Sequence, residues 1–179
     1  MLRRPPGSAF TLIELLTVIT IIGILAGIVI GVGRRAGESG REARAKVELA
    51  AITTALESYK RQYGDYPRTN SGAALLQALV GKIDPKLQSL NPQGRVLLDL
   101  ALFTTDNEGD PLSNSLLLLV DPWEQPYHYV YKPTGMTWTN PSYVIYSRGP
   151  DEAANDSLLN GGYPNRNEAS NLDNIYAFN

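Results

Sequence analysis

One carboxylate stands in an otherwise uncharged apolar stretch near the N-terminus. Residues 10–33 contain Glu14 as their single charged residue, and the nineteen residues 15–33 carry no charge. A charged side chain inside a bilayer costs at least roughly 2.5 to 3.5 kcal/mol, so Glu14 needs the membrane surface or a cationic partner. If the chain were cut after Ala9, the new α-amino group of Phe10 would lie at the depth of Glu14. It could then neutralise the Glu14 of a neighbouring copy, which would make the pair an assembly device.

A second set of residues has the chemistry of a cation site. The stretch 147–174 is crowded with Asp, Asn, Ser and Gly and has almost no apolar periodicity, which indicates a loop. Hard cations such as calcium prefer carboxylate, amide and backbone carbonyl oxygens, and this stretch supplies many of them. Its spacing is not that of an EF-hand, so the residues alone indicate only a solvated loop.

The apolar stretch 10–33 is long enough to cross a hydrocarbon layer as a helix that rises about 1.5 Å per residue. A secretory signal peptide has a shorter apolar region of about 7 to 15 residues. A plain single-pass anchor explains the length but not Glu14 or the basic, proline-containing leader 1–9. We therefore predict a membrane and assembly helix over 10–33.

Three glycines within this stretch are four residues apart. Gly23, Gly27 and Gly31 would share one helix face, where small residues permit close approach of another helix. Glycine is also common in membrane helices, so ordinary composition is the alternative. The spacing makes the three residues candidate assembly positions.

Residues 34–64 continue the helix with an amphipathic pattern. Apolar residues recur at intervals of three and four, at Ala45, Leu49, Ile52, Leu56, Tyr59 and Tyr63. Most charged residues lie off this stripe: Glu42, Arg44, Lys46, Glu48, Glu57 and Lys60. Gly64 and Pro67 predict the end of the helix.

Residues 65–179 have the pattern of a head domain that combines a helix with a small sheet. Residues 72–80 predict a second helix. The aromatic and β-branched segments 127–131 and 143–146 predict an antiparallel strand pair that packs on the long helix. Residues 95–104 could form a strand or a short helix, and residues 115–120 are compatible with a strand. The predicted fold class is therefore α+β.

Composition excludes several classes of function. The 179 residues include no Cys, so disulfides and thiolate metal sites are ruled out. The formal net charge of -2, without a basic patch, argues against nucleic acid as a partner. His128 has no second His or Cys to join it, and no nucleophile motif or phosphate loop is present, so we expect a structural protein rather than an enzyme.

The sequence FTLIELL, after a short Arg-containing leader and before a wholly apolar run, resembles the class III signal of type IV pilins and of type II secretion pseudopilins. The resemblance implies that a prepilin peptidase removes the leader, that the new N-terminal Phe10 is methylated, and that the apolar segment forms the filament core. The family usually has Gly before the cut, where this chain has Ala9. Gly7 lies two residues earlier, but cutting there would change the distance from Glu14 to the new amine, so cleavage between Ala9 and Phe10 is favoured.

The head extends the resemblance to the major pseudopilins of type II secretion. The segment 59–81 is similar to the family stretch after the long helix, and residues 121–127 to the signature that opens the sheet, although Glu124 and Gln125 depart from its usual residues. By motif position, the resemblance implies a calcium site in the polar loop. Its ligands would be the carbonyl of Arg148 and the side chains of Asp151, Asp173 and Asn174. Asn174 stands where the family commonly has an acid, and the residues between Glu152 and Asn171 are an insertion.

The resemblance implies a pilin-like subunit that polymerises with copies of itself into a periplasmic filament driving type II secretion. Its other partners would be the prepilin peptidase, further pseudopilins and the inner-membrane secretion platform. It would be a single-pass inner-membrane protein with its head in the periplasm. Basic residues oppose this orientation, because Arg3 and Arg4 precede the span and five follow it: Arg34, Arg35, Arg41, Arg44 and Lys46. The alternatives are a type IV pilin, which typically relies on a disulfide that this chain cannot form, and a membrane-anchored enzyme or solute-binding module.

Overall fold

The computed structural model describes most of the chain: residues 10–135, 137–138, 142–159 and 161–178, with the backbone alone for residues 28–35. The chain divides into two units, Met1–Ser39 and Gly40–Asn179. One helix, α1 (Leu12–Tyr63), contributes residues to both units. The predicted leader, including Ala9, lies outside the described residues.

Helix α1 ends where its sequence predicts. Gly64 adopts a left-handed backbone with φ of +86°, and its amide donates to the carbonyl of Lys60 at 2.7 Å. A residue without Cβ takes this conformation at little steric cost, which is why glycine commonly closes a helix. The chain therefore leaves the helix axis directly after Tyr63.

The first unit consists of the N-terminal part of α1, whose large apolar side chains lie open. From Leu12 to Leu25 these side chains are 48 to 82 % exposed, and a Cβ added at Gly23 or Gly27 would touch nothing. Among the described residues, no helix is long and apolar enough to cross a membrane. Residues 28–33 of the predicted span lie outside the described side chains.

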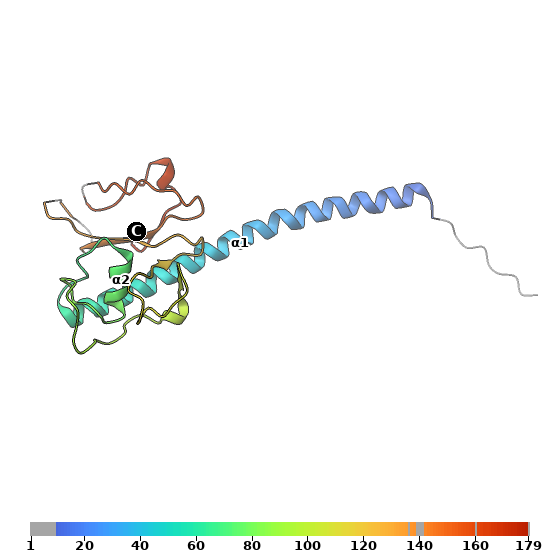
Figure 1. Ribbon diagram of the computed structural model, residues 1–179. Coiled ribbons are helices and arrows are strands. Elements are labelled where there is room, and N and C mark those ends of the chain that lie inside the picture. The colour runs from blue at the N-terminus through green and yellow to red at the C-terminus, as the bar shows by residue number, and fades with distance from the viewer. Residues whose placement is uncertain (1–9, 136, 139–141, 160, 179) are drawn as a thin grey trace, which may run out of the picture. The chain divides into compact units, whose positions relative to one another are not determined.

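The second unit combines the C-terminal part of α1 with a second helix, two short 3-10 turns and two small sheets (Figure 1). The further elements are α2 (Gly72–Leu79), η1 (Leu100–Leu102), β1 (Thr104–Thr105), β2 (Leu119–Val120), β3 (His128–Tyr131), β4 (Tyr143–Ser147), η2 (Ala169–Asn171) and β5 (Ile175–Tyr176). Strands β3, β4 and β5 form one antiparallel sheet with β4 in the middle, and β1 pairs with β2. The predicted α+β class and the antiparallel β3–β4 pair are confirmed.

Strand β5 was not predicted, because the sequence of the tail indicates only a loop. Ile175 pairs with Ser147 and Tyr176 with Tyr146, so the free edge of β4 supplies the hydrogen-bonding partners. Ile175 is also buried. Two residues are too few to show the periodicity of a strand, so the local sequence could not predict it. The strand forms because it pairs with β4.

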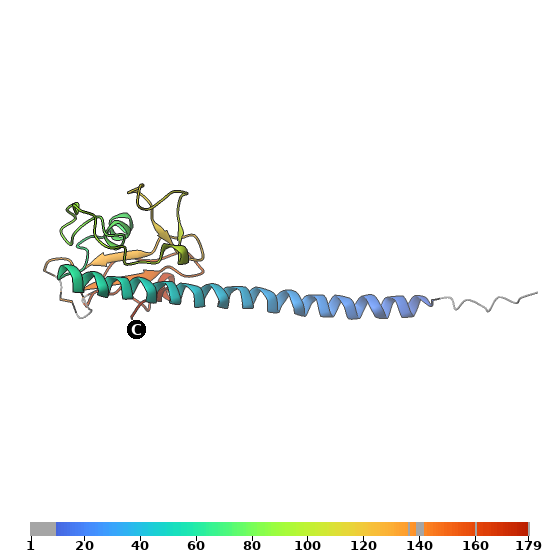
Figure 2. The same ribbon diagram turned by 90° about the horizontal axis from the view of Figure 1, so that it is seen from below.

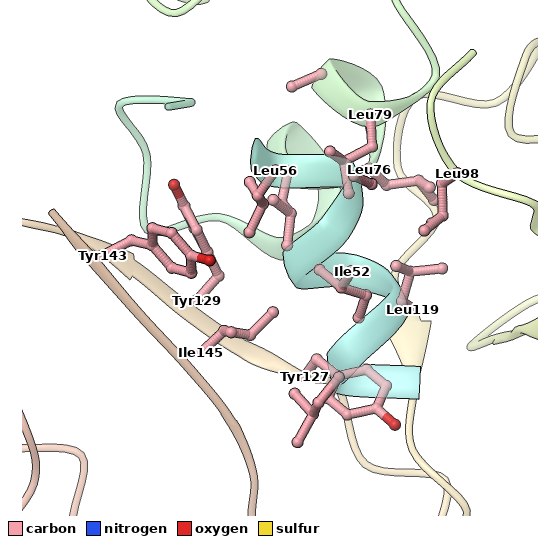
Figure 3. Close-up of a cluster of buried hydrophobic side chains, with 14 of the residues drawn as sticks. Ile52, Leu56, Leu76, Leu79, Leu98, Leu119, Tyr127, Tyr129, Tyr143 and Ile145 are labelled. Atoms are coloured by element: carbon pink, nitrogen blue, oxygen red, sulfur yellow. The ribbon is translucent and has the colours of Figure 1, made fainter. Parts of the chain in front are cut away.

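The core forms around one face of α1, and both the second helix and the sheet contribute to it. Figure 3 shows Ile52 and Leu56 of α1 between Leu76 and Leu79 of α2 on one side and aromatic strand residues on the other. The predicted apolar stripe is buried at Ala45, Leu49, Ile52, Leu56 and Tyr59, whereas Tyr63 is partly exposed. The helical period of the sequence therefore identified the buried face of α1.

Glu48 contradicts the expected separation of charged and apolar residues along α1. Its side chain is 3 % exposed, although the sequence pattern placed it off the apolar stripe. The carboxylate accepts a hydrogen bond from Nε of Arg44 at 2.6 Å and another from the Tyr127 hydroxyl at 2.6 Å. A buried charge is tolerated when it is paired and hydrogen-bonded. Here the bond from Tyr127 also ties α1 to the segment that precedes β3.

The signature 121–127 forms a turn organised by the buried Asp121. One carboxylate oxygen accepts from the amides of Trp123 at 2.9 Å and Gln125 at 3.0 Å, and the other accepts from the Ser147 hydroxyl. The turn therefore holds the end of β4 beside the start of β3. Glu124 lies within it at φ of +66°, a left-handed conformation that costs a residue other than glycine roughly 1 to 2 kcal/mol.

Replacing Tyr127 with Phe tests the buried charge. Tyr127→Phe leaves the Glu48 carboxylate with one donor fewer in a dry site, and a lost bond to a charged group typically costs about 1.5 to 3 kcal/mol. We expect the free energy of unfolding of the full chain in detergent to fall by that amount, measured by urea denaturation. The matched control is Tyr131→Phe, whose hydroxyl donates to the partly exposed Asp65 at 2.9 Å. An equal loss in both variants would show that burial of the Glu48 charge is not the cause.

Candidate assembly and metal sites

The assembly carboxylate, Glu14, takes part in an N-terminal capping box. Its Oε2 accepts from the backbone amide of Thr11 at 2.8 Å and from the Thr11 hydroxyl at 2.7 Å, while the Glu14 amide donates to Thr11 Oγ1 at 3.3 Å. Thr11 therefore caps α1, and Glu14 lies three residues inside it, the arrangement typical of a capping box. These bonds hold the carboxylate at the first turn of the helix, next to Phe10.

The other predicted assembly residues are only partly described. Phe10 is 81 % exposed and has no contact that would bury its ring within the unit. Gly23 and Gly27 are open on the helix surface, whereas the surroundings of Gly31 and all of Ala9 lie outside what the structure describes. Within the described residues, no side chain of the first unit covers the apolar surface of the N-terminal part of α1.

The polar loop that leads to the predicted metal site is folded by amide side chains. Asn171 is buried, and its Oδ1 accepts from the Asn155 amide at 2.9 Å. Its Nδ2 donates to the carbonyls of Asn155 at 3.2 Å and Asn165 at 2.9 Å. One buried side chain thus ties residue 155 to residue 165 within the insertion, because it satisfies backbone groups of both.

Arg166 holds the same insertion against the sheet. Its guanidinium lies 4.4 Å from the ring centre of Tyr163 and 4.2 Å from that of Tyr176, and it donates to the Phe178 carbonyl at 3.0 Å. Cation–π contacts of this kind contribute about 0.5 to 2 kcal/mol, depending on exposure. The insertion therefore has fixed contacts with β5.

The structure brings together the two ends of the predicted calcium site. The Asp151 amide donates to Asp173 Oδ2 at 2.9 Å, although the two residues are far apart in sequence. Gly149 lies so close that an added Cβ would be 2.3 Å from the Asp173 carbonyl oxygen. Gly149 also has φ of +71°, so both its conformation and the close backbone approach require glycine.

Two oxygens of the predicted ligands are buried without a partner. Asp173 Oδ1 and Asn174 Oδ1 accept no hydrogen bond, while Asn174 Nδ2 donates to Asn171 Oδ1 at 3.2 Å and to the Tyr176 hydroxyl at 3.3 Å. Leaving a buried acceptor unsatisfied is costly, and a hard cation would satisfy both. In the described part of the chain no group of three or more His, Cys, Asp or Glu could hold a metal, so a site here would rely on amide and carbonyl oxygens as well as acids.

The neighbouring oxygens are already engaged elsewhere. Glu152 accepts from the Gln125 side chain at 3.2 Å, and Asn155 Oδ1 accepts from the Ser157 amide at 3.1 Å. Asp156 accepts from the hydroxyl of Tyr146 and from the Arg148 guanidinium at 2.7 Å. The guanidinium of Arg148 thus pairs with Asp156, whereas the group of Arg148 predicted as a ligand is its backbone carbonyl.

His128 has a structural environment. Its ring lies against that of Tyr146, with the centres 4.9 Å apart and the planes tilted by 44°, and Nδ1 lies 3.9 Å from Asp156. Burial lowers the pKa of His128 more than the Asp156 carboxylate raises it, and Arg148 lowers it further. The imidazole is therefore neutral at neutral pH.

Sequence reasoning missed two residues that shape these sites. Thr11 was not singled out, although the spacing Thr-x-x-Glu before an apolar run is a known capping signal. Asn171 was recognised only as the end of an insertion, and no local pattern shows that its side chain is buried. Its role depends on backbone groups from residues 155 and 165, which are brought near by the fold.

Comparisons with known proteins identify relatives of this chain. The family model described as "Type II secretion system (T2SS), protein G" matches residues 33–165. The type II secretion system core protein G of Pseudomonas aeruginosa is 32 % identical over 173 residues, which cover 97 % of this chain and 100 % of that protein. The protein of the same name from Escherichia coli is 29 % identical over 161 residues, 86 % of this chain and 90 % of that protein. In Vibrio cholerae it is 31 % identical over 130 residues, 73 % and 75 % of the two chains.

No solved structure matches the chain. The family model nevertheless spans most of the sequence, and the relative from Pseudomonas aeruginosa aligns over its whole length. Both include the turn that contains Asp121 and the helix face that carries the core. The chain therefore belongs to the type II secretion system protein G family, the family of the major pseudopilin.

Proposed function

We propose that this pseudopilin polymerises through α1 into a filament, with Glu14 paired to the α-amino group of Phe10 on a neighbouring copy. The single observation that carries the proposal is the open apolar surface of the N-terminal part of α1. Large side chains from Leu12 to Leu25 are about half exposed or more in the isolated chain. Apolar surface in water is unfavourable by roughly 25 cal/mol per Å², so lipid or other helices must cover this face.

Glu14 gives such an assembly a defined register. Its carboxylate is held at the helix N-terminus by Thr11 and has no basic partner there among the described residues. In an apolar assembly an unpaired carboxylate is costly, whereas a pair with a free amine offsets much of that cost. Only one longitudinal offset between copies brings the amine and the carboxylate together, so the pair selects that offset.

The same proposal includes the partners and the location of the subunit. A prepilin peptidase would remove residues 1–9 and methylate Phe10. Other pseudopilins and the inner-membrane secretion platform would incorporate the subunit, with α1 anchored in the inner membrane and the head in the periplasm. The family match favours this role over that of a type IV pilin.

We further propose that the head binds calcium through Asp151, Asp173, Asn174 and the Arg148 carbonyl. The unpartnered buried oxygens of Asp173 and Asn174 support the proposal. A bound cation would supply positive charge to those oxygens and link the loop after β4 to the segment before β5. In a chain without Cys, no disulfide can make that connection.

Processing at Phe10 is tested by sequencing the N-terminus of the mature protein and measuring its mass. We expect the sequence to begin FTLIELL and the mass to correspond to residues 10–179 plus one methyl group. The physical reason is that only this cut places a free amine beside the Glu14 turn. A mature chain that begins elsewhere, or that retains the leader, would remove the basis for the amine pair.

Glu14→Ala tests the assembly mechanism. We expect the variant to insert into membranes normally and to form at least about tenfold fewer filaments, since roughly 1.4 kcal/mol lost per contact already changes an equilibrium tenfold. Filament yield is measured in sheared and detergent-soluble fractions. Glu14→Gln should fail similarly, because it removes the charge alone, while Glu14→Asp should retain part of the yield. Unchanged yield in Glu14→Ala would exclude the amine pair.

Calcium binding is tested by thermal unfolding of the full chain in detergent, with calcium and with chelator. A ligand at about 100 times its Kd stabilises the folded state by about 2.7 kcal/mol. For a domain of this size we expect chelation to lower the Tm by roughly 5 to 10 °C. Asp173→Asn should abolish the response, whereas Glu168→Gln, in the same loop but outside the ligand set, should keep it. A Tm independent of chelator would contradict the metal site.

A further inference from the structure

The orientation of the Asn171 side chain is fixed by the backbone around it. Asn171 ends η2, the red turn of Figure 1, which is seen from below in Figure 2, and it is 1 % exposed. The backbone amide of Asn155, which can only donate, lies 2.9 Å from Oδ1. The carbonyls of Asn155 and Asn165, which can only accept, lie 3.2 and 2.9 Å from Nδ2. Exchanging the two ends of the Asn171 amide would break all three bonds, so only one orientation is compatible with the fold.

Asn171 in turn determines the orientation of the Asn174 amide. Asn174 Nδ2 donates to Asn171 Oδ1 at 3.2 Å and to the Tyr176 hydroxyl at 3.3 Å. An amide oxygen cannot donate, so Asn171 Oδ1 bonds only to the nitrogen of Asn174. A hydroxyl can donate or accept, so Tyr176 can bond to either end of the Asn174 amide. Asn171, and not Tyr176, therefore selects which end of Asn174 is left for another partner.

The end left for another partner is an oxygen. Oδ1 of Asn174 is buried and accepts no hydrogen bond, and the same holds for Oδ1 of Asp173, the preceding residue. Asp173 Oδ2 is engaged by the Asp151 amide at 2.9 Å. If the Asn174 amide were reversed, an NH2 group would take the place of Oδ1, and that group has only hydrogens to offer. A hard cation requires oxygen ligands, so only the orientation that Asn171 selects suits one.

We propose that Asn171 is a positioning residue for the calcium site. It supplies no ligand itself, but it holds the Asn174 amide with the oxygen available to the ion. This role rests on the calcium site proposed above. An acid at position 174 would have two equivalent oxygens and would need no orientation, whereas an amide does. Because Asn171 is held by residues 155 and 165, the calcium affinity of this chain depends on the fold of the insertion.

A double-mutant cycle between positions 171 and 174 separates orientation from a general structural effect. Calcium chloride is titrated into the full chain in detergent, and the Kd is measured by isothermal titration calorimetry. We expect Asn171→Ala to weaken calcium binding about tenfold or more, as is typical when the partner that orients a metal ligand is lost. In the Asn174→Asp background, Asn171→Ala should weaken binding by no more than about twofold, because a carboxylate has no wrong end. Equal weakening in both backgrounds would overturn the proposal.

Tyr176→Phe is the matched control, since it also removes one hydrogen bond from Asn174 Nδ2. The ring that packs against Tyr146 and Tyr163 is retained. The Tyr176 hydroxyl does not select the orientation of the amide, so we expect the calcium Kd to change by no more than about twofold. A loss as large as that of Asn171→Ala would show that any anchor of the amide is sufficient, and it would contradict a specific role of Asn171.

Asn174→Asp gives a readout that needs neither calcium nor a folded Asn171→Ala variant. A carboxylate cannot donate, so one of its oxygens would face Asn171 Oδ1 with no proton between them. We expect the Tm of the full chain in detergent with chelator to fall by roughly 3 to 6 °C. Asn167→Asp makes the same charge change at an exposed residue of the insertion and should keep the parent Tm. An unchanged Tm in Asn174→Asp would refute the orienting bond.

The results also distinguish the role of Asn171 from the calcium site itself. If the parent chain binds calcium and Asn171→Ala binds it equally well, the proposed site stands and the positioning role is refuted. If the parent chain does not bind calcium, both are refuted.

Discussion

Burial of one face of α1 is the constraint on which the head depends. The buried residues Ala45, Leu49, Ile52, Leu56 and Tyr59 lie along this face, and α2, β3 and β4 all place side chains on it. Without cysteines, packing around the helix is the main source of stability that the described residues provide. The sheet is too small to form a core of its own, and it becomes stable only on the helix.

Two buried carboxylates, Glu48 and Asp121, connect the sheet to the buried face of α1 and to the turn beside it. Glu48 is on the buried face, so its carboxylate needs partners, and Tyr127 and Arg44 provide them. Burial and the Glu48 carboxylate together raise the pKa of the Tyr127 hydroxyl, which therefore remains a hydrogen-bond donor throughout the neutral pH range. Asp121 then orders the adjoining turn and the end of β4 through Ser147. Helix, turn and central strand are thus connected by a short series of buried polar contacts.

The sequence predicted the long helix, its end, α2 and the β3–β4 pair, because each has a local pattern of several residues. The sequence could not predict that Glu48 is buried. A helical period indicates which face of the helix a residue lies on, but not how much of that face the rest of the head covers. The sequence missed β5 because the edge of β4, not the local sequence, determines that strand. Asp151 and Asp173 were singled out as ligands only from family resemblance; in the structure they are joined through the Asp151 backbone amide, which donates to Asp173. The insertion was expected to be a solvated loop, yet the amide of Asn171 gives it internal contacts that no periodicity reveals.

Asn174 stands where the resemblance leads us to expect an acid, and its hydrogen bonds show how an amide could still serve a cation site. A carboxylate at this position could only accept hydrogen bonds, whereas the Asn174 amide donates from Nδ2 to Asn171 Oδ1 and to the Tyr176 hydroxyl. Those two bonds hold Oδ1 in a buried position without a partner of its own. The substitution thus removes one negative charge but fixes an oxygen next to Asp173 and joins it to the insertion through Asn171. For a hard cation, which requires oxygen ligands in a set arrangement, a fixed neutral oxygen partly offsets the lost charge. The same hydrogen bonds need no ion, so the amide network would keep the insertion closed over β5 when the proposed site is empty.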